Sequence, residues 1–532
     1  MTVGERIVAG LKNAGVQRLF GMPGGGSNAE LIETAARLGL PFSLAHTETA
    51  AAFMACAQAE ITGAPGACIA TLGPGSAAIM NGVAHAFLDR VPLAVITDCY
   101  PQALAHMQHQ NLRNGAMFAA VTKFSAQLSV ENAGEVLTDA MHALADPPPG
   151  PVHLDVSAEI ACSHGKGGCQ PGKASASASR MEDIPPQTQQ LLRQMRRPVF
   201  LIGLGARTKQ IAAALRELCE ARGIPALVTY KAKGVVPDRH AWFGGLFTNG
   251  ASERDILQRA DGLLAVGLDP VELLPVPWRF SAPVVSINPW PIQQRQIPAM
   301  GEFVGDVPAW LTKLAQCLAA CSDWSQPEIS GFVKAQRAAM RPRNQDAKMA
   351  PHGVVEVVAH VYPGARVTVD AGAHMFPVMS LWPASEPCSV LISNGLSTMG
   401  FALPSAIGAA LLDPSQPTMA FTGDGGLMMC LGELRTAARE NLPVRIIVFD
   451  DGVLSLIKVK QMKRGFKTNG VSIGDMNWGA LAGSMGVLGR SAATEDELFS
   501  CLRETASHPG PVLIAAKISE ETYPETIRVL RG

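Results

Sequence analysis

The sequence predicts an α/β protein built from three doubly wound parallel sheets. The chain has 532 residues, which is too many for one hydrophobic core and enough for about three domains of ordinary size. Short apolar runs alternate with helical patterns along most of the chain, as is typical of parallel sheets covered by helices on both faces. We expect domains at 1–162, 186–330 and 366–532, joined by a linker at 163–185 and a connecting helical segment at 331–365.

Composition narrows the function classes. Hydrophobic residues make up 47% of the chain, charged residues 17%, and the net charge is −1. Because no basic excess is present, small molecules and copies of the same chain are expected as partners, not nucleic acid. Eleven cysteines include no Cys-x-x-Cys pair, which fits a reducing compartment. With no signal-peptide pattern and no long uncharged apolar span, we expect a cytoplasmic protein that does not bind a membrane.

The first segment opens with an amphipathic helix directly after Met1 and continues with short apolar strands between helices. The strands are expected at residues 19–21, 67–71, 93–97 and 152–156. The stretch 163–179 that follows is rich in small and polar residues, and this composition predicts an exposed linker.

The second segment opens with a strand at 198–202 that ends on Gly203 and Gly205. This start is similar to that of a dinucleotide site, but the third glycine of the fingerprint is missing, so we expect a Rossmann-like structural domain without FAD or ADP. Further strands are expected at 226–229, 262–266 and 283–287, and a helical segment at 330–347 leads to the third segment.

Two aspartates of the third segment, Asp424 and Asp451, lie at the ends of neighbouring apolar runs, twenty-seven residues apart. After a first strand at 366–370, a strand is expected at 417–422, a helix at 427–440 and a strand at 444–449. A right-handed crossover between parallel strands brings both ends to one edge of the sheet, where open α/β sheets bind ligands. Two carboxylates beside a glycine-rich helix start predict a Mg²⁺ and phosphate site.

This order of strand, Gly-Asp-Gly-Gly turn, helix, strand and Asp-Asp resembles the cofactor-binding motif of the thiamine diphosphate enzymes, close to the acetolactate synthase and benzoylformate decarboxylase group. The three segments resemble that family's pyrimidine, central and diphosphate domains. The resemblance implies Mg²⁺ bound by Asp424, Asp451 and the backbone carbonyl of Val453. Gly425 and Gly426 would let backbone amides approach the diphosphate. Relatives usually have Asn at the second aspartate, so this chain adds one negative charge.

Further cofactor-binding positions follow from the same resemblance. His374 matches a histidine that contacts the diphosphate, although Ala373 stands where relatives often have Gln. Gly395, through its backbone carbonyl, and Met399, as a bulky wedge, would hold the cofactor in a bent form. Leu454, three residues after Asp451, is the last of the expected cofactor-binding residues.

Glu48 lies twenty-five residues before Gly73, the first residue of a Gly-Pro-Gly turn, and family members carry a glutamate at that distance. The resemblance implies that this carboxyl group hydrogen-bonds N1′ of the cofactor's pyrimidine ring and so controls its tautomer, which makes Glu48 the catalytic candidate. Thr47 occupies the place where relatives often have His.

The family reaction implies that a 2-oxo acid is decarboxylated and that the resulting enamine is joined to a second carbonyl compound. A simple decarboxylase of the benzoylformate decarboxylase kind and a catalytically silent cofactor-binding homologue are the alternatives. Lys460 stands where acetolactate synthases place a substrate-gating Trp, which favours another 2-oxo acid. The candidate substrate-binding residues lie in the first segment: Gly25, Ser27, His106, His109 and Gln110.

Assembly is also implied by the resemblance. In the family, the glutamate belongs to one subunit and the diphosphate motif to its neighbour, so a single chain would lack a complete site. We therefore expect a homodimer or homotetramer with sites between subunits.

Overall fold

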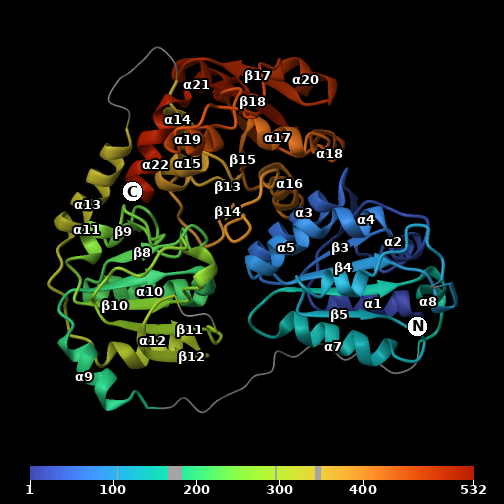
Figure 1. Ribbon diagram of the computed structural model, residues 1–532, viewed down its shortest axis with the longest axis horizontal. Coiled ribbons are helices and arrows are strands. Elements are labelled where there is room, and N and C mark those ends of the chain that lie inside the picture. The colour runs from blue at the N-terminus through green and yellow to red at the C-terminus, as the bar shows by residue number, and fades with distance from the viewer. Residues whose placement is uncertain (105, 166–182, 294–295, 342–348) are drawn as a thin grey trace.

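The computed structural model describes residues 1–104, 106–165, 183–293, 296–341 and 349–532. They form three six-stranded sheets, in which neighbouring strands run parallel, surrounded by helices (Figure 1). The expected fold class of three parallel-sheet α/β domains is confirmed. Most of the predicted linker, residues 166–182, and residues 342–348 of the connecting segment lie outside the described residues. No helix in the described part of the chain is long and apolar enough to cross a membrane.

The first sheet has the strand order β2-β1-β3-β4-β6-β5. Its strands are β1 (Leu19–Gly21), β2 (Phe42–Leu44), β3 (Gly66–Ala70), β4 (Leu93–Asp98), β5 (Phe124–Gln127) and β6 (Pro151–Val156). Its helices are α1 (Val3–Asn13), α2 (Ser27–Arg37), α3 (Glu48–Thr62), α4 (Pro74–Ala78), α5 (Met80–Leu88), the short η1 (Gln102–Leu104), α6 (Asn114–Phe118), α7 (Ala133–Ala145) and α8 (Ala158–Cys162). The sequence prediction missed β2 and β5, because these half-buried edge strands carry too few apolar residues to form a recognisable run.

The second sheet has the order β12-β11-β10-β7-β8-β9. Its strands are β7 (Pro198–Ile202), β8 (Ala226–Val228), β9 (Phe243–Leu246), β10 (Gly262–Val266), β11 (Val284–Asn288) and β12 (Ala299–Val304). Its helical elements are α9 (Pro186–Gln194), η2 (Leu204–Ala206), α10 (Lys209–Arg222), α11 (Arg254–Leu257), η3 (Pro270–Glu272), α12 (Val307–Ala315) and α13 (Gln326–Met340). The helix expected at 330–347 therefore begins earlier, where Ser325 accepts a hydrogen bond from the Glu328 amide.

The glycine turn after β7 packs against its own domain. A Cβ atom on Gly203 would lie 2.5 Å from the Cα atom of Leu268, and the Leu204 amide donates to the buried Glu272 carboxylate at 2.8 Å. The Gly205 amide donates to the Gly267 carbonyl, also at 2.8 Å. These glycines thus allow close packing between segments of the same domain.

The third sheet has the order β14-β13-β15-β16-β18-β17. Its strands are β13 (Arg366–Val369), β14 (Val390–Ile392), β15 (Thr418–Gly423), β16 (Val444–Asp450), β17 (Leu488–Ala492) and β18 (Val512–Lys517). Its helices are α14 (Pro351–Val361), α15 (Met375–Leu381), α16 (Ala402–Leu412), α17 (Asp424–Met429), α18 (Glu433–Arg439), α19 (Ser455–Lys463), α20 (Trp478–Ser484), α21 (Glu495–Glu504), η4 (Glu520–Thr522) and α22 (Tyr523–Arg531).

The single helix predicted at 427–440 is wrong in detail, because it is two helices. α17 starts three residues earlier, at Asp424, and the chain breaks at 430–432 before α18. The break lies against the first domain: a Cβ atom on Gly432 would lie 3.0 Å from the Cβ atom of His46. The break between the two helices thus lies at a contact between domains, which the local sequence pattern does not reveal.

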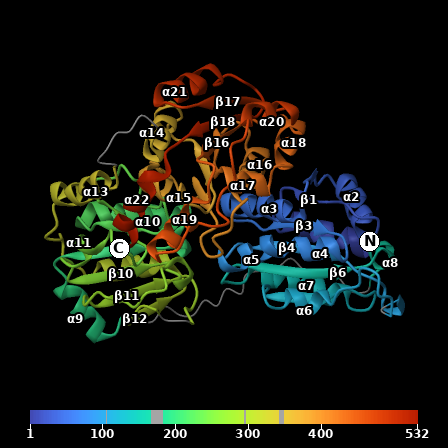
Figure 2. The same ribbon diagram turned by 45° about the horizontal axis from the view of Figure 1, so that its top comes forward.

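The first and third domains share a hydrophobic core. α3 packs along α16, and a Cβ atom on Gly408 would lie 2.4 Å from the Met54 carbonyl oxygen (Figure 2). The Gln58 side-chain amide also donates to the Gly408 carbonyl at 3.0 Å. The small residues of both helices allow this close approach. The contact fixes the position of the carboxyl edge of the first sheet relative to the third domain.

Candidate active site

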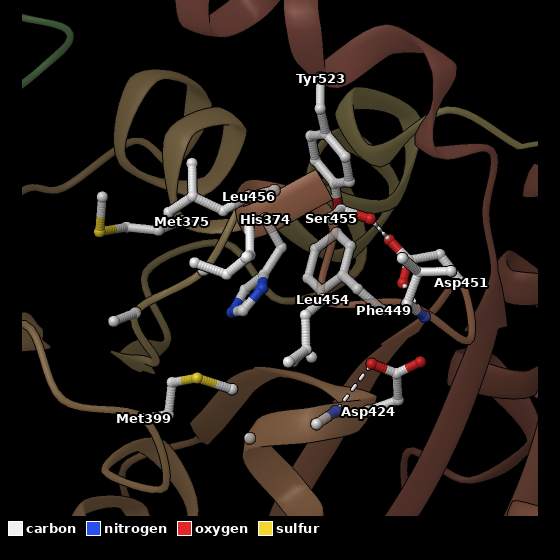
Figure 3. A pocket seen from close by; sticks show the side chains of 18 of the residues that line it. His374, Met375, Met399, Asp424, Phe449, Asp451, Leu454, Ser455, Leu456 and Tyr523 are labelled. Carbon is white, nitrogen blue, oxygen red and sulfur yellow. Dashed lines mark hydrogen bonds between the residues drawn. The ribbon is translucent and has the colours of Figure 1, made fainter. Parts of the chain in front are cut away.

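The structure places Asp424 and Asp451 at neighbouring strand ends, as the sequence predicts. β15 and β16 are hydrogen-bonded neighbours with Gly423 paired to Phe449, and each aspartate directly follows its strand. We call Asp424 and Asp451 the acid pair. Both side chains lie at the carboxyl edge of the sheet (Figure 3).

Hydrogen bonds hold each carboxylate of the acid pair. Asp424 is 3% exposed; it accepts the Gly425 amide at 2.7 Å through one oxygen and the Gly452 amide at 2.7 Å through the other. Asp451 accepts the Val453 amide at 3.1 Å and the Ser455 hydroxyl at 2.6 Å. Since Asp424 reaches the turn that carries Asp451, the two strand ends are tied together.

The electrostatics of the acid pair favour the binding of a cation. Burial raises the pKa of Asp424 to about 6. Burial, together with the neighbouring Asp424 carboxylate, raises the pKa of Asp451 to about 7. Two partly buried carboxylates that oppose each other's ionisation are stabilised when a divalent cation binds between them.

A cavity of about 360 Å³, which we call the third-domain cavity, adjoins the acid pair. His374, Met399, Gly425, Gly426, Val453 and Leu454 line it together with the acid pair. Its wall also includes Tyr523 and Arg531 from α22 and Lys460 from α19, none of which the sequence identified as part of a cofactor site. Within the described residues, neither Lys460 nor Arg531 forms an ion pair.

His374 projects into this cavity beside the ring of Phe449, with the ring centroids 5.2 Å apart (Figure 3). It is 5% exposed, and burial lowers its pKa to about 3, so the imidazole is neutral. Its Nε2 atom is buried and has no hydrogen-bond partner among the described residues. A buried polar nitrogen without a partner is costly, and a ligand oxygen would satisfy it.

The glycines of the Gly-Asp-Gly-Gly turn make room for protein atoms. A Cβ atom on Gly426 would lie 2.2 Å from an oxygen of Asp370, and one on Gly425 would lie 2.8 Å from Leu454. Asp370 is fully buried and accepts the amides of Gly400, Phe401 and Ala402, so it fixes the start of α16 and the loop that carries Met399. This role was not predicted from the sequence, although Asp370, like the acid pair, follows a strand.

Gly395 does not line the third-domain cavity. Its amide donates to Asp89 at 2.7 Å, and a Cβ atom there would lie 2.8 Å from Leu88 of α5. The residue therefore faces the first domain. Within the single chain, these contacts do not support a direct role for Gly395 in cofactor binding.

Four first-domain candidates gather at the carboxyl edge of the first sheet. A Cβ atom on Gly75 would lie 3.0 Å from an oxygen of Glu48, and one on Gly73 would lie 2.7 Å from Gln110. Gly25 is exposed after β1, while Ser27 is fully buried and donates its amide to Asp98 at 3.2 Å.

His106 and His109 are exposed on the loop after η1. A second cavity, of about 200 Å³, is lined by Gln110 and also by Asp98, the last residue of β4, which was not predicted as a site residue. Glu48 lines neither of these two cavities. Neither of these two cavities is therefore lined by both Glu48 and the acid pair.

Comparison with known proteins shows the family of the chain. Three family models match the chain: the N-terminal binding domain of thiamine pyrophosphate enzymes at residues 1–117, their central domain at 187–314, and their C-terminal binding domain at 370–516. The chain belongs to the thiamine pyrophosphate (thiamine diphosphate) enzymes, and it is an enzyme dependent on that cofactor.

Curated relatives match it over nearly its whole length. The catabolic acetolactate synthase of Raoultella terrigena is 28% identical over 98% of this chain and 95% of its own. The acetolactate synthase of Bacillus subtilis (strain 168) is 28% identical over 96% and 92%, and the large subunit of acetolactate synthase isozyme 1 of Escherichia coli (strain K12) is 29% identical over 98% and 95%.

Proposed function

We propose that this protein is a thiamine diphosphate- and Mg²⁺-dependent enzyme of the acetolactate synthase type. It decarboxylates a 2-oxo acid and joins the remaining acyl unit to a second carbonyl compound. The acid pair beside the unpartnered Nε2 of His374 carries this proposal, because it offers a cation site and a phosphate contact in one cavity. The names of the curated relatives support the reaction type.

The residues of the third-domain cavity fit the diphosphate end of the cofactor. The acid pair and the Val453 carbonyl would hold Mg²⁺; that carbonyl accepts the Ser455 amide at 2.8 Å and keeps a second lone pair. Among the described residues, no group of three or more His, Cys, Asp or Glu side chains could hold a metal, so phosphate oxygens would complete the shell. His374 would donate a hydrogen bond from Nε2 to a phosphate oxygen.

Bound thiamine diphosphate supplies the nucleophilic carbon and the electron sink for decarboxylation. The residues of the chain would bind and orient the cofactor. The Glu48 carboxyl group would also hold a proton at N1′ of the pyrimidine ring. Lys460 and Arg531 add positive charge to the cavity wall, which favours an anionic ligand such as the carboxylate of a 2-oxo acid.

We further propose that two copies of the chain complete the site. Glu48 lies outside the cavity of the acid pair, so the glutamate of one copy would meet the acid pair of another in a homodimer or homotetramer. Analytical ultracentrifugation with an activity assay tests this, and a fully active monomer would contradict it.

Product analysis tests the reaction. The purified protein, with thiamine diphosphate and Mg²⁺, is incubated with pyruvate, 2-oxobutyrate or benzoylformate. Acetolactate or another acyloin supports the proposal, whereas an aldehyde alone indicates a simple decarboxylase. Cofactor binding with no turnover of any 2-oxo acid would indicate a catalytically silent homologue.

A further inference from the structure

A buried carboxylate of the third domain reaches into the first domain next to Glu48. Glu433, the first residue of α18, is 1% exposed. One of its oxygens accepts the backbone amide of His46 at 2.8 Å and that of Thr47 at 3.2 Å. His46 and Thr47 are the two residues directly before Glu48.

The other oxygen of Glu433 is held from its own helix. It accepts the Thr436 hydroxyl at 2.7 Å, and the same hydroxyl lies 2.8 Å from Nδ1 of His46. Both ends of the carboxylate are thus fixed, and its orientation toward the two amides is not free to change. Hydrogen bonds to an ionised acceptor are shorter and stronger than neutral ones.

The turn held in this way is the one that delivers Glu48. Thr47 caps α3 by accepting the Ala50 amide at 3.1 Å, and Glu48 is the first residue of that helix. The cap fixes the turn from inside the first domain, and Glu433 fixes it from the third. Gly432 packs on His46, since a Cβ atom there would lie 3.0 Å from the His46 Cβ atom.

We propose that Glu433 is a positioning residue for Glu48. It holds the two amides before Glu48 so that the Glu48 carboxyl group meets the pyrimidine ring of the cofactor in a single orientation. This inference rests on the role of Glu48 proposed above. It differs from a general contribution to domain packing, because it concerns the orientation of one side chain and hence the pyrimidine end of the cofactor, not the diphosphate end.

The test compares Glu433→Ala with Glu433→Gln in the full-length protein. Alanine leaves both amides without an acceptor, whereas glutamine keeps one neutral oxygen for them. We expect kcat to fall at least about tenfold for alanine and less for glutamine, because misplacing a catalytic group by about 1 Å can cost about 10²-fold in rate. The KM for the 2-oxo acid should change little, and the circular-dichroism signature of the bound cofactor's tautomers should weaken in the same order.

Arg439→Ala provides a matched control. Arg439 also lies in α18 and donates across the same domain contact, to the Leu44 carbonyl, without touching the two amides. An equal loss of kcat and of the circular-dichroism signature in Arg439→Ala and Glu433→Ala would overturn the inference, since general loosening of the contact would then explain both.

Glu48→Gln separates the inference from the proposed function. If Glu48→Gln keeps wild-type kcat, the proposed role of Glu48 is wrong. If Glu48→Gln is inactive while folded Glu433→Ala keeps wild-type kcat, only the positioning role is wrong. If Glu433→Ala does not fold, Glu433→Gln decides: a reduced kcat with a weaker tautomer signature supports the inference, and wild-type values of both overturn it.

Discussion

The substitution Asp451→Asn tests the electrostatics of the acid pair. Asparagine can still accept the Val453 amide and can donate to the Ser455 hydroxyl oxygen, so the turn keeps its hydrogen bonds. What it loses is one negative charge beside Asp424. The variant therefore removes both the cost of burying this charge and its repulsion with Asp424 in the absence of a metal.

The pKa of Asp451 gives the size and sign of the effect. It rises from 3.8 to about 7 in the folded protein. The folded state then binds its proton more tightly than the unfolded chain, so ionisation lowers stability progressively as pH rises from 4 to 7. A shift of about three pKa units corresponds to about 4 kcal/mol above pH 7, an upper limit because Asp424 shares the interaction.

The assay is unfolding of the metal- and cofactor-free protein at pH 5 and pH 8. Asp451→Asn should be more stable than the wild type, with an advantage larger at pH 8 by about 2 to 3 kcal/mol. Hydrogen bonds from Ser415 lower the pKa of Asp413, so Asp413→Asn is a control of opposite sign that gains no stability at pH 8. An advantage of Asp451→Asn that is equal at both pH values would refute the reasoning.

The remaining predictions concern catalysis, packing and substrate binding. Glu48→Gln should lower kcat by about 10² to 10⁴, the usual worth of positioned proton transfer, measured under saturating cofactor. Gly426→Ala should cost about 1 to 3 kcal/mol in urea unfolding, because the new Cβ atom would meet Asp370, whereas Gly25→Ala, with open space around its Cβ, should cost far less. Lys460→Leu should raise the KM for the 2-oxo acid by up to about fivefold, since an exposed charge contributes at most about 1 kcal/mol. An unchanged KM would show that this lysine does not face the substrate.

Local sequence patterns were sufficient for strands such as β4, β10 and β16 and for the acid pair, but β18, although its run is apolar and buried, was not predicted. The run 444–449 and the turn after 417–422 predicted two neighbouring strand ends, and β15 and β16 pair there. Short edge strands such as β2 and β5 were not predicted, because each offers only two apolar residues. The roles assigned to the individual cofactor and substrate residues stay predictions.

The sequence by itself determined the three parallel-sheet domains, the family and the placement of Asp424 and Asp451 at one sheet edge. Only the tertiary structure decided that Gly426 makes room for Asp370, that Glu433 holds the turn before Glu48, and that Glu48 lies outside the cavity of the acid pair. The physical reason is the short distance along the sequence over which a local pattern carries information. Periodicity and turn chemistry record what neighbouring residues do, whereas these contacts join segments that lie far apart in the sequence, within the third domain or between two domains, and their meeting is set by packing of the whole chain.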